Sequence, residues 1–147
     1  MSRWSDLMDA HYAELYAQVP DVGCKGLCSD SCGPIDMHPY ERARIRRAGV
    51  QIPSPAAALK QMATIGDYTC PALVDGRCSV YEIRPMICRV WGASEALPCE
   101  HGCQPAGGRL TEAKTRHLVN ASTDRAGPGR EPPHPTPPTL DHCRKHP

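Results

Sequence analysis

The chain has 147 residues and a formal net charge of +1, with no Phe, two Trp and five Tyr. So few large apolar side chains exclude an extensive hydrophobic core, and the near-neutral charge gives no global attraction to nucleic acid or to a membrane surface. With 16 Pro, 12 Gly and nine Cys, the composition predicts one small, loop-rich domain that needs covalent or metal cross-links to fold.

The N-terminal segment bears on whether the cysteines form disulfides. Charged residues, among them Arg3, Asp6 and Glu14, are spread through residues 1–17, and the segment lacks the apolar stretch of a signal peptide. No stretch of the chain approaches the roughly 18 apolar residues of a membrane-spanning helix. We therefore expect a cytoplasmic protein without a membrane partner, in which reducing conditions keep thiols free and a cysteine cluster binds metal.

Two helices are predicted in the first third of the chain. Apolar side chains at helical spacing predict a helix over roughly 3–18, which Pro20 ends. The Gly- and Cys-rich segment 21–34 has no periodicity and is expected to be a loop that wraps around a ligand. A second helix is predicted over 39–48, because proline suits its first turn and glycine follows its last.

Three further elements are predicted downstream. Residues 69–81 have the pattern of a β-hairpin with its turn at Asp75-Gly76. Pro85 can begin a short helix, and one more helix is predicted over roughly 111–119. These elements together indicate a small, metal-stabilised, loop-rich α+β fold, with mostly short helices and one hairpin around a multi-cysteine metal centre.

The elements suggest three regions along the chain. Residues 1–19 are expected to form an N-terminal amphipathic helix, and residues 20–119 a cysteine-cluster metal-binding domain. Residues 120–147 are rich in Pro and poor in apolar side chains, which predicts a disordered tail.

Eight of the nine cysteines form three groups, and they carry the functional signal. Thiolates a few residues apart on a tight loop can bind one ion, and soft thiolates select zinc, copper(I) or iron–sulfur centres over magnesium or calcium. Eight thiolates can complete two four-sulfur shells, as two zinc ions, one zinc beside a four-iron cluster, or a multinuclear site with bridging sulfurs. The spacing leaves open which cysteines share a shell. The candidate metal ligands are Cys24, Cys28, Cys32, Cys70, Cys78, Cys88, Cys99 and Cys103.

Two motifs resemble a known family. The first is the C-x3-C-x3-C-G-P-I run over 24–35, and the second is the C-P-A-L … G-R-C-S-V-Y-E-I-R-P-M-I-C-R pattern over 70–89. Together they resemble the YkgJ-type cysteine-cluster (CxxCxxCC) family of bacterial zinc- or iron-chelating domains, over roughly residues 20–105. The resemblance implies that the six cysteines of these motifs are metal ligands, with Arg84 and Arg89 around them.

The chain departs from the family pattern at one position. The first motif of the family usually ends in a Cys-Cys pair, whereas here Cys32 is followed by Gly33. Cys99 or Cys103 can replace the missing ligand, and their spacing would place both on one face of a helical turn. His101 is a further candidate ligand, because imidazole also suits zinc and iron, although a surface position is the favoured interpretation.

The leading functional hypothesis is a protein that binds metal ions, with zinc favoured over iron, and with the metal structural or bound as cargo. A closed four-sulfur shell leaves no position for a reacting water, and no motif of a hydrolase or nucleotide-binding enzyme occurs, so an enzyme is not favoured. One alternative is an iron–sulfur redox or enzyme domain. Another is a nucleic-acid or protein interaction module based on the arginines at 42, 44, 46 and 47, although a solvated helix face is the favoured interpretation and nucleic acid is a disfavoured partner. The substrate and oligomeric state stay open.

Overall fold

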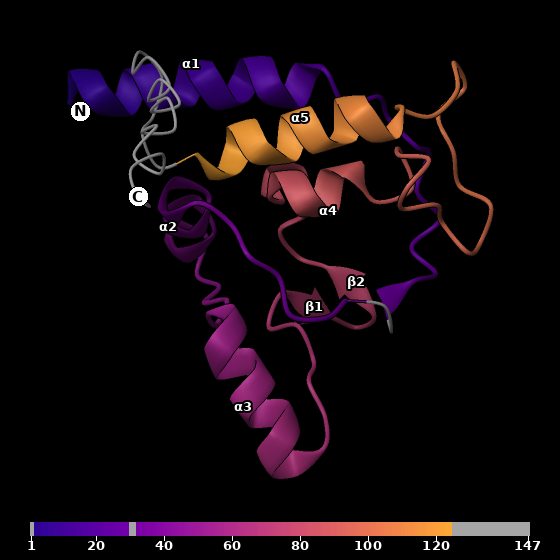
Figure 1. Cartoon of the computed structure of the whole chain (residues 1–147). Helices are drawn as coiled ribbons and strands as arrows, with labels where there is room; N and C mark the ends of the chain where they lie inside the picture. Colours follow the sequence, from indigo (N-terminus) through magenta and orange to yellow (C-terminus); the bar gives the residue numbers. More distant parts are fainter. Residues whose placement is uncertain (1, 30–31, 125–147) are drawn as a thin grey trace, which may run out of the picture.

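The computed structural model describes residues 2–29 and 32–124. The described part is helix-rich α+β with one two-stranded antiparallel hairpin, which confirms the predicted mixture of helices and hairpin. None of its helices is long and apolar enough to cross a membrane. The elements, in chain order, are α1 (Arg3–Ala17), α2 (Pro39–Arg47), α3 (Pro55–Ile65), β1 (Leu73–Val74), β2 (Arg77–Cys78), the 3₁₀-helix η2 (Tyr81–Ile83), α4 (Met86–Val90) and α5 (Glu112–Thr123) (Figure 1).

Side chains at the helix starts explain where the predicted helices begin. The N–H groups of a first helical turn lack partners within the helix, so a side-chain acceptor just before it stabilises the start. Ser2 Oγ accepts a hydrogen bond from Ser5 N at 3.3 Å, and His38 Nδ1 accepts one from Tyr40 N at 3.0 Å. Both helices therefore begin where the sequence predicts.

The helix α3 was not predicted, although the sequence contains its start and stop signals. Ser54 Oγ accepts a hydrogen bond from Ala57 N at 3.2 Å, Pro55 occupies the first turn, and Gly66 ends the helix with φ of +75°. Ala58 is its buried side chain, and Leu59 and other apolar residues along it are exposed. In Figure 1 this helix projects away from the other helices.

The main apolar cluster lies between α1, α2, α4 and α5, and α1 runs alongside α5 (Figure 1). Tyr12 stacks on Tyr40 with ring centroids 4.6 Å apart, and its hydroxyl donates to the Ser122 carbonyl at 2.5 Å. Ser122 and Leu118 are buried in α5. These contacts extend α5 to Thr123, so residues 120–123 of the predicted tail are helical, and residues 125–147 lie outside the described residues.

A second apolar cluster lies under the hairpin and contains Met37, Ile45, Ile52, Ala72 and Val80. The hairpin turn at Asp75-Gly76 has positive φ at both residues, +51° and +75°. That backbone matches the tight turn for which Asp-Gly is favoured, which confirms the predicted turn. The Ser79 N–H donates to the Ala72 carbonyl at 2.7 Å and extends the pairing beyond the strands.

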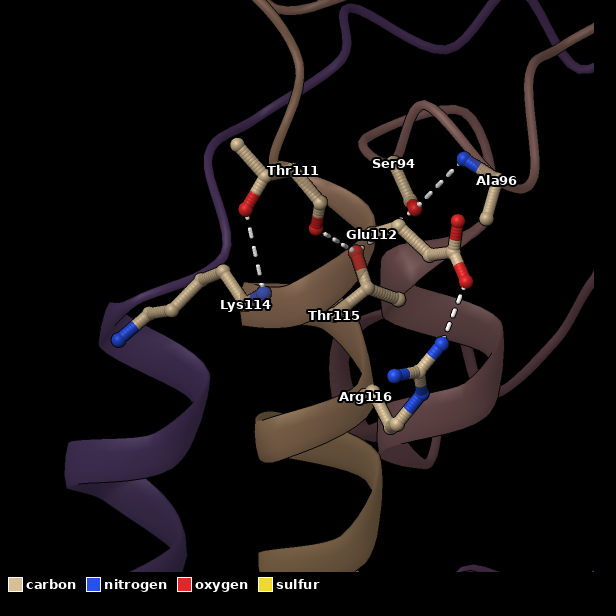
Figure 2. Close-up of polar contacts among 7 residues, drawn as sticks. All are labelled: Ser94, Ala96, Thr111, Glu112, Lys114, Thr115 and Arg116. Carbon is tan, nitrogen blue, oxygen red and sulfur yellow. Dashed lines mark hydrogen bonds and ion pairs between the residues drawn. The ribbon is translucent and has the colours of Figure 1, made fainter.

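The segment between α4 and α5 is held against the start of α5. Figure 2 shows Thr115 Oγ1, which lies within hydrogen-bond distance of Ser94 Oγ, at 2.7 Å, and of the Thr111 carbonyl oxygen, at 2.9 Å. Ser94 Oγ in turn accepts from Ala96 N at 3.1 Å. The Leu110 N–H donates to the Ala93 carbonyl at 2.7 Å. Both ends of the loop that carries Cys99 and Cys103 are therefore fixed to the helical core.

A buried carboxylate joins three of the helices. Glu41 of α2 is only 2 % exposed, and its Oε1 accepts hydrogen bonds from Tyr16 Oη of α1 at 2.7 Å and from Met86 N of α4 at 2.8 Å. Burial is the largest influence on this carboxyl and raises its pKa, and the two hydrogen bonds act in the opposite direction. The Met86 N–H lies at the start of α4 and has no acceptor within the helix. Its hydrogen bond to Glu41 therefore fixes the position of the helix that carries Cys88.

Candidate metal centre

The first cysteine group lies in the loop between α1 and α2. Gly23 and Gly26 lie on either side of Cys24 with φ of +59° and +70°, a left-handed backbone that glycine tolerates best. The Gly26 N–H donates to Cys24 Sγ at 3.3 Å. Cys24 is exposed, whereas Cys28 and Cys32 are half-buried. The loop therefore holds one sulfur at the surface and two further in.

The second group is positioned by the hairpin and by α4. The Leu73 N–H donates to the Cys70 carbonyl at 3.0 Å, and Leu73 pairs with Cys78 across the hairpin. Cys70 and Cys78 both pack against the second apolar cluster. Cys88 lies in α4, and its N–H donates to the Pro85 carbonyl at 3.0 Å. All three cysteines are half-buried.

Cys99 and Cys103 lie in a hydrogen-bonded turn between α4 and α5, and not in the helical turn that their spacing predicts. The Gly102 N–H donates to the Cys99 carbonyl at 3.2 Å, and the His101 N–H donates to Cys99 Sγ at 3.4 Å. A φ of +78° at Gly102 breaks any helical continuation. Cys103 is buried, whereas His101 is exposed, as the favoured interpretation of this histidine predicts.

The tertiary structure places six of the eight candidate ligands around one cavity, which Cys99 and Cys103 do not line. Within the described ranges, 2–29 and 32–124, no three Cys, His, Asp or Glu side chains are close enough to share one ion as they stand. Ion binding would therefore require the sulfurs to move closer together. Six of the eight candidate ligands line an open cavity of about 810 Å³, namely Cys24, Cys28, Cys32, Cys70, Cys78 and Cys88.

Burial and neighbouring thiols set the proton affinity of several of these cysteines. Burial raises the pKa of Cys28, of Cys78 and, to about 12, of Cys88, and nearby thiols add to each increase. Cys99 differs: its slight burial acts upward, but hydrogen bonds from the N–H groups of His101 and Cys103 and from the Cys103 side chain lower its pKa. Buried thiols with raised pKa values remain protonated until a cation replaces the proton.

The two arginines that the family resemblance places around the cysteines have different positions. The positive charge of Arg84 acts on Cys78, although burial is the stronger influence and raises the pKa of that thiol. The Arg84 guanidinium also lies over the Tyr81 ring, 3.8 Å from its centroid. Arg89 donates from Nε to the Arg84 carbonyl at 2.8 Å and lies over the Tyr16 ring. Arg84 is thus close to a candidate ligand, and Arg89 connects η2 and α4 to α1.

A buried hydroxyl supports a metal fit, and sequence reasoning missed it. Tyr68 Oη is buried and has no hydrogen-bond partner among the described residues. Burial raises the pKa of Tyr68, and the thiols of Cys70, Cys32 and Cys88 also act on its hydroxyl. A metal-bound thiolate accepts hydrogen bonds well, so this hydroxyl is a suitable donor to a metal-bound sulfur there. The only sequence signal was a tyrosine two residues before Cys70.

The arginine-rich helix α2 offers less free positive charge than its sequence suggests. Arg42 Nη1 donates to the carbonyls of Ile52 and Pro53, the second at 3.1 Å. Arg44 lies over the Tyr16 ring, 5.5 Å from its centroid. Two of the four arginines thus make contacts within the molecule, and the two at 46 and 47 are exposed.

One of three comparisons with known proteins gave a match. A family model, CxxCxxCC, described as "Putative zinc- or iron-chelating domain", matches residues 23–104, which is more than half of the chain and includes all eight candidate ligands. The searches of curated proteins and of solved structures gave no match. The family match supports metal binding in general and is compatible with either zinc or iron. The chain therefore belongs to the CxxCxxCC family.

Proposed function

We propose that the protein binds zinc through the thiolates of its eight core cysteines. One observation carries the proposal: cysteines from the loop before α2, from the hairpin and from α4 line the same cavity. Thiolates are the ligands that zinc favours in closed structural sites, and eight of them complete two four-sulfur shells. The buried, unpaired hydroxyl of Tyr68, on which the thiols of Cys70, Cys32 and Cys88 act, is an available hydrogen-bond donor to a metal-bound sulfur.

The metal in this proposal is structural or is carried as cargo. Catalytic zinc typically has three protein ligands and one exchangeable position, whereas a four-thiolate shell leaves no position for water. A structural role is consistent with the fold, because each ion would join loops that are far apart in the sequence. A structural zinc contributes on the order of 10 kcal/mol to folding in small zinc domains.

Iron is the alternative occupant of the same thiols, either as single ions or in an iron–sulfur cluster. Thiolate ligands suit both metals, and an iron–sulfur cluster would favour a redox or enzyme role. The two cases differ in composition, because a cluster contains acid-labile sulfide and absorbs visible light. Direct metal analysis therefore separates them.

The test is to purify the full chain without oxygen and without a metal-affinity tag, and to measure zinc, iron and acid-labile sulfide per chain together with the visible spectrum. We expect about two zinc ions per chain, as two four-sulfur shells require, with no sulfide and no colour. Iron with matching sulfide and a brown colour would establish the iron–sulfur alternative. A folded protein without either metal, even after reconstitution of the reduced chain with zinc or with iron and sulfide, would refute metal binding.

A chelator provides an independent check of the structural role. Removing the metal with a strong chelator should lower the urea midpoint of unfolding, and adding zinc back should restore it, because the ion binds the folded chain far more tightly than the unfolded one. The control is the Cys143→Ser variant, which removes a thiol outside the eight candidate ligands. An unfolding curve that is the same with and without metal would show that the metal is not structural.

A further inference from the structure

The eight candidate ligands can be divided into two sets of four according to the thiols that act on Cys28 and on Cys88. The outer quartet consists of Cys24, Cys28, Cys99 and Cys103. The inner quartet consists of Cys32, Cys70, Cys78 and Cys88. The first cysteine motif therefore divides between them, with two members in the outer quartet and the last in the inner one.

Gly92 marks the point where the two segments of the outer quartet meet. A Cβ placed on Gly92 would lie 3.4 Å from Cys99 Cβ, 3.7 Å from Val22 Cγ1 and 3.8 Å from the Cys103 carbonyl oxygen. Val22 is two residues before Cys24, so the segment that begins the first motif packs beside the Cys99–Cys103 turn. The absence of a side chain at Gly92 permits this close approach.

The outer quartet repeats one local geometry twice. In both C-x3-C segments, the N–H two residues after the first cysteine donates to its sulfur, from Gly26 to Cys24 at 3.3 Å and from His101 to Cys99 at 3.4 Å. Cys28 ends the first of these segments. Burial has the largest effect on its thiol, and the neighbouring thiols that act on it are Cys24 of its own segment and Cys99 and Cys103 of the other.

The inner quartet is assembled around the hairpin and the second apolar cluster. Cys70 and Cys78 are joined through Leu73, which hydrogen-bonds to one and pairs with the other, and both pack on that cluster. Cys88 of α4 is surrounded differently from Cys28: besides burial, the thiols that act on it are those of Cys32, Cys78 and Cys70. Three members of this quartet, Cys70, Cys32 and Cys88, also act on the buried and unpaired Tyr68 hydroxyl.

We propose that the outer and inner quartets are two separate four-thiolate metal sites, an inference that rests on the metal-binding function proposed above. The outer site joins the loop before α2 to the turn before α5, and the inner site joins that same loop to the hairpin and to α4. The loop 21–34 therefore connects both sites. We expect the outer ion to exchange faster through the exposed Cys24, although Cys103 of the same quartet is buried.

Cadmium-113 NMR of the full chain tests this pairing directly. The protein is reduced, stripped of its native metal and reconstituted with ¹¹³Cd²⁺, which binds thiolates as zinc does and couples to the β-protons of each bound cysteine. We expect two cadmium resonances, one coupled to the four outer cysteines and the other to the four inner cysteines. Coupling of one resonance to members of both quartets, or of one cysteine to both ions, would overturn the pairing.

Serine variants give a second test that separates the two proposals. Cys28→Ser and the double variant Cys28→Ser/Cys99→Ser should each retain one of two zinc ions, because both changes affect the same site. The double variant Cys28→Ser/Cys78→Ser should lose both ions, while Cys143→Ser keeps both. Failure of the wild-type chain to bind zinc or cadmium would refute metal binding itself. Two bound ions with a different pattern of losses would refute only the division into quartets.

Discussion

Replacing Glu41 by alanine should lower the free energy of unfolding by about 2–4 kcal/mol, since two groups would each lose a hydrogen bond to a charged acceptor. The Glu41 carboxylate is 2 % exposed and accepts from Tyr16 Oη at 2.7 Å and from Met86 N at 2.8 Å. Leaving one such group buried and unpaired costs about 1–3 kcal/mol. Removal of the desolvated carboxylate itself offsets part of that loss.

The assay is urea unfolding of the zinc-loaded chain, followed by circular dichroism at constant pH and metal concentration. Glu82→Ala is the matched control, because Glu82 is an exposed glutamate whose removal should change stability by no more than about 0.5 kcal/mol. Glu41→Gln retains an oxygen acceptor and should fall between the two. Equal stability of Glu41→Ala and Glu82→Ala would show that Glu41 does not join α1, α2 and α4 in the way described.

The same variant connects the core to the metal sites. Met86 begins α4, and Cys88 lies two residues further along the same helix. If Glu41 fixes this helix, Glu41→Ala should weaken binding at the inner quartet more than at the outer quartet. Competition with a chelator, with the two ¹¹³Cd resonances followed separately, measures this difference. Equal weakening of both sites would indicate a general loss of folding instead.

Three further predictions concern single groups in and near the sites. Burial raises the pKa of Glu41 in the folded state, so the protonated carboxyl contributes stability that is fully present below the usual Glu pKa and is lost as pH rises through the raised value. The stability difference between wild type and Glu41→Gln should therefore shift in favour of wild type as pH falls through this window. A difference that does not change with pH would contradict this expectation. Gly92→Ala places a side chain 3.4 Å from Cys99 Cβ at a φ of +79°. The free energy of unfolding should fall by about 1–2 kcal/mol, and the zinc content should drop from two ions to one. Retention of two ions would argue against the packing at Gly92. Tyr68→Phe should weaken chelator-resistant binding at the inner quartet by about tenfold, and unchanged or tighter binding would mean that the hydroxyl has no metal-bound partner.

The elements that the sequence predicts best are those with local chemical signals at their ends. The helix starts at Ser2 and His38 and the Asp75-Gly76 turn depend on contacts between residues at most three positions apart, so they can be recognised without the fold. The helix α3 had signals of the same kind, a serine and a proline at its start and a glycine at its end. The helix was nevertheless not predicted, although these signals are as local as those at Ser2 and His38.

The candidate site divides in a similar way. The identity of the eight candidate ligands and their preference for a soft metal follow from residue type and spacing, because thiolate chemistry is local. The environment of each thiol does not follow from spacing. Cys28 and Cys32 are neighbours in one C-x3-C-x3-C run, yet our proposal assigns them to different quartets. Tyr68 gained significance only through the burial of its unpaired hydroxyl.

The sequence by itself therefore determined the donor chemistry, the family motifs, the hairpin and three of the long helices. Only the tertiary structure decided which cysteines are neighbours, that Glu41 is buried between three helices, and how far α5 extends. The physical reason is the range of the interactions. Caps and tight turns form between residues close together in the chain. The approach of Val22 to the Cys99–Cys103 turn at Gly92 instead joins segments far apart in the sequence, and it depends on how the helices pack and hold the loops in place.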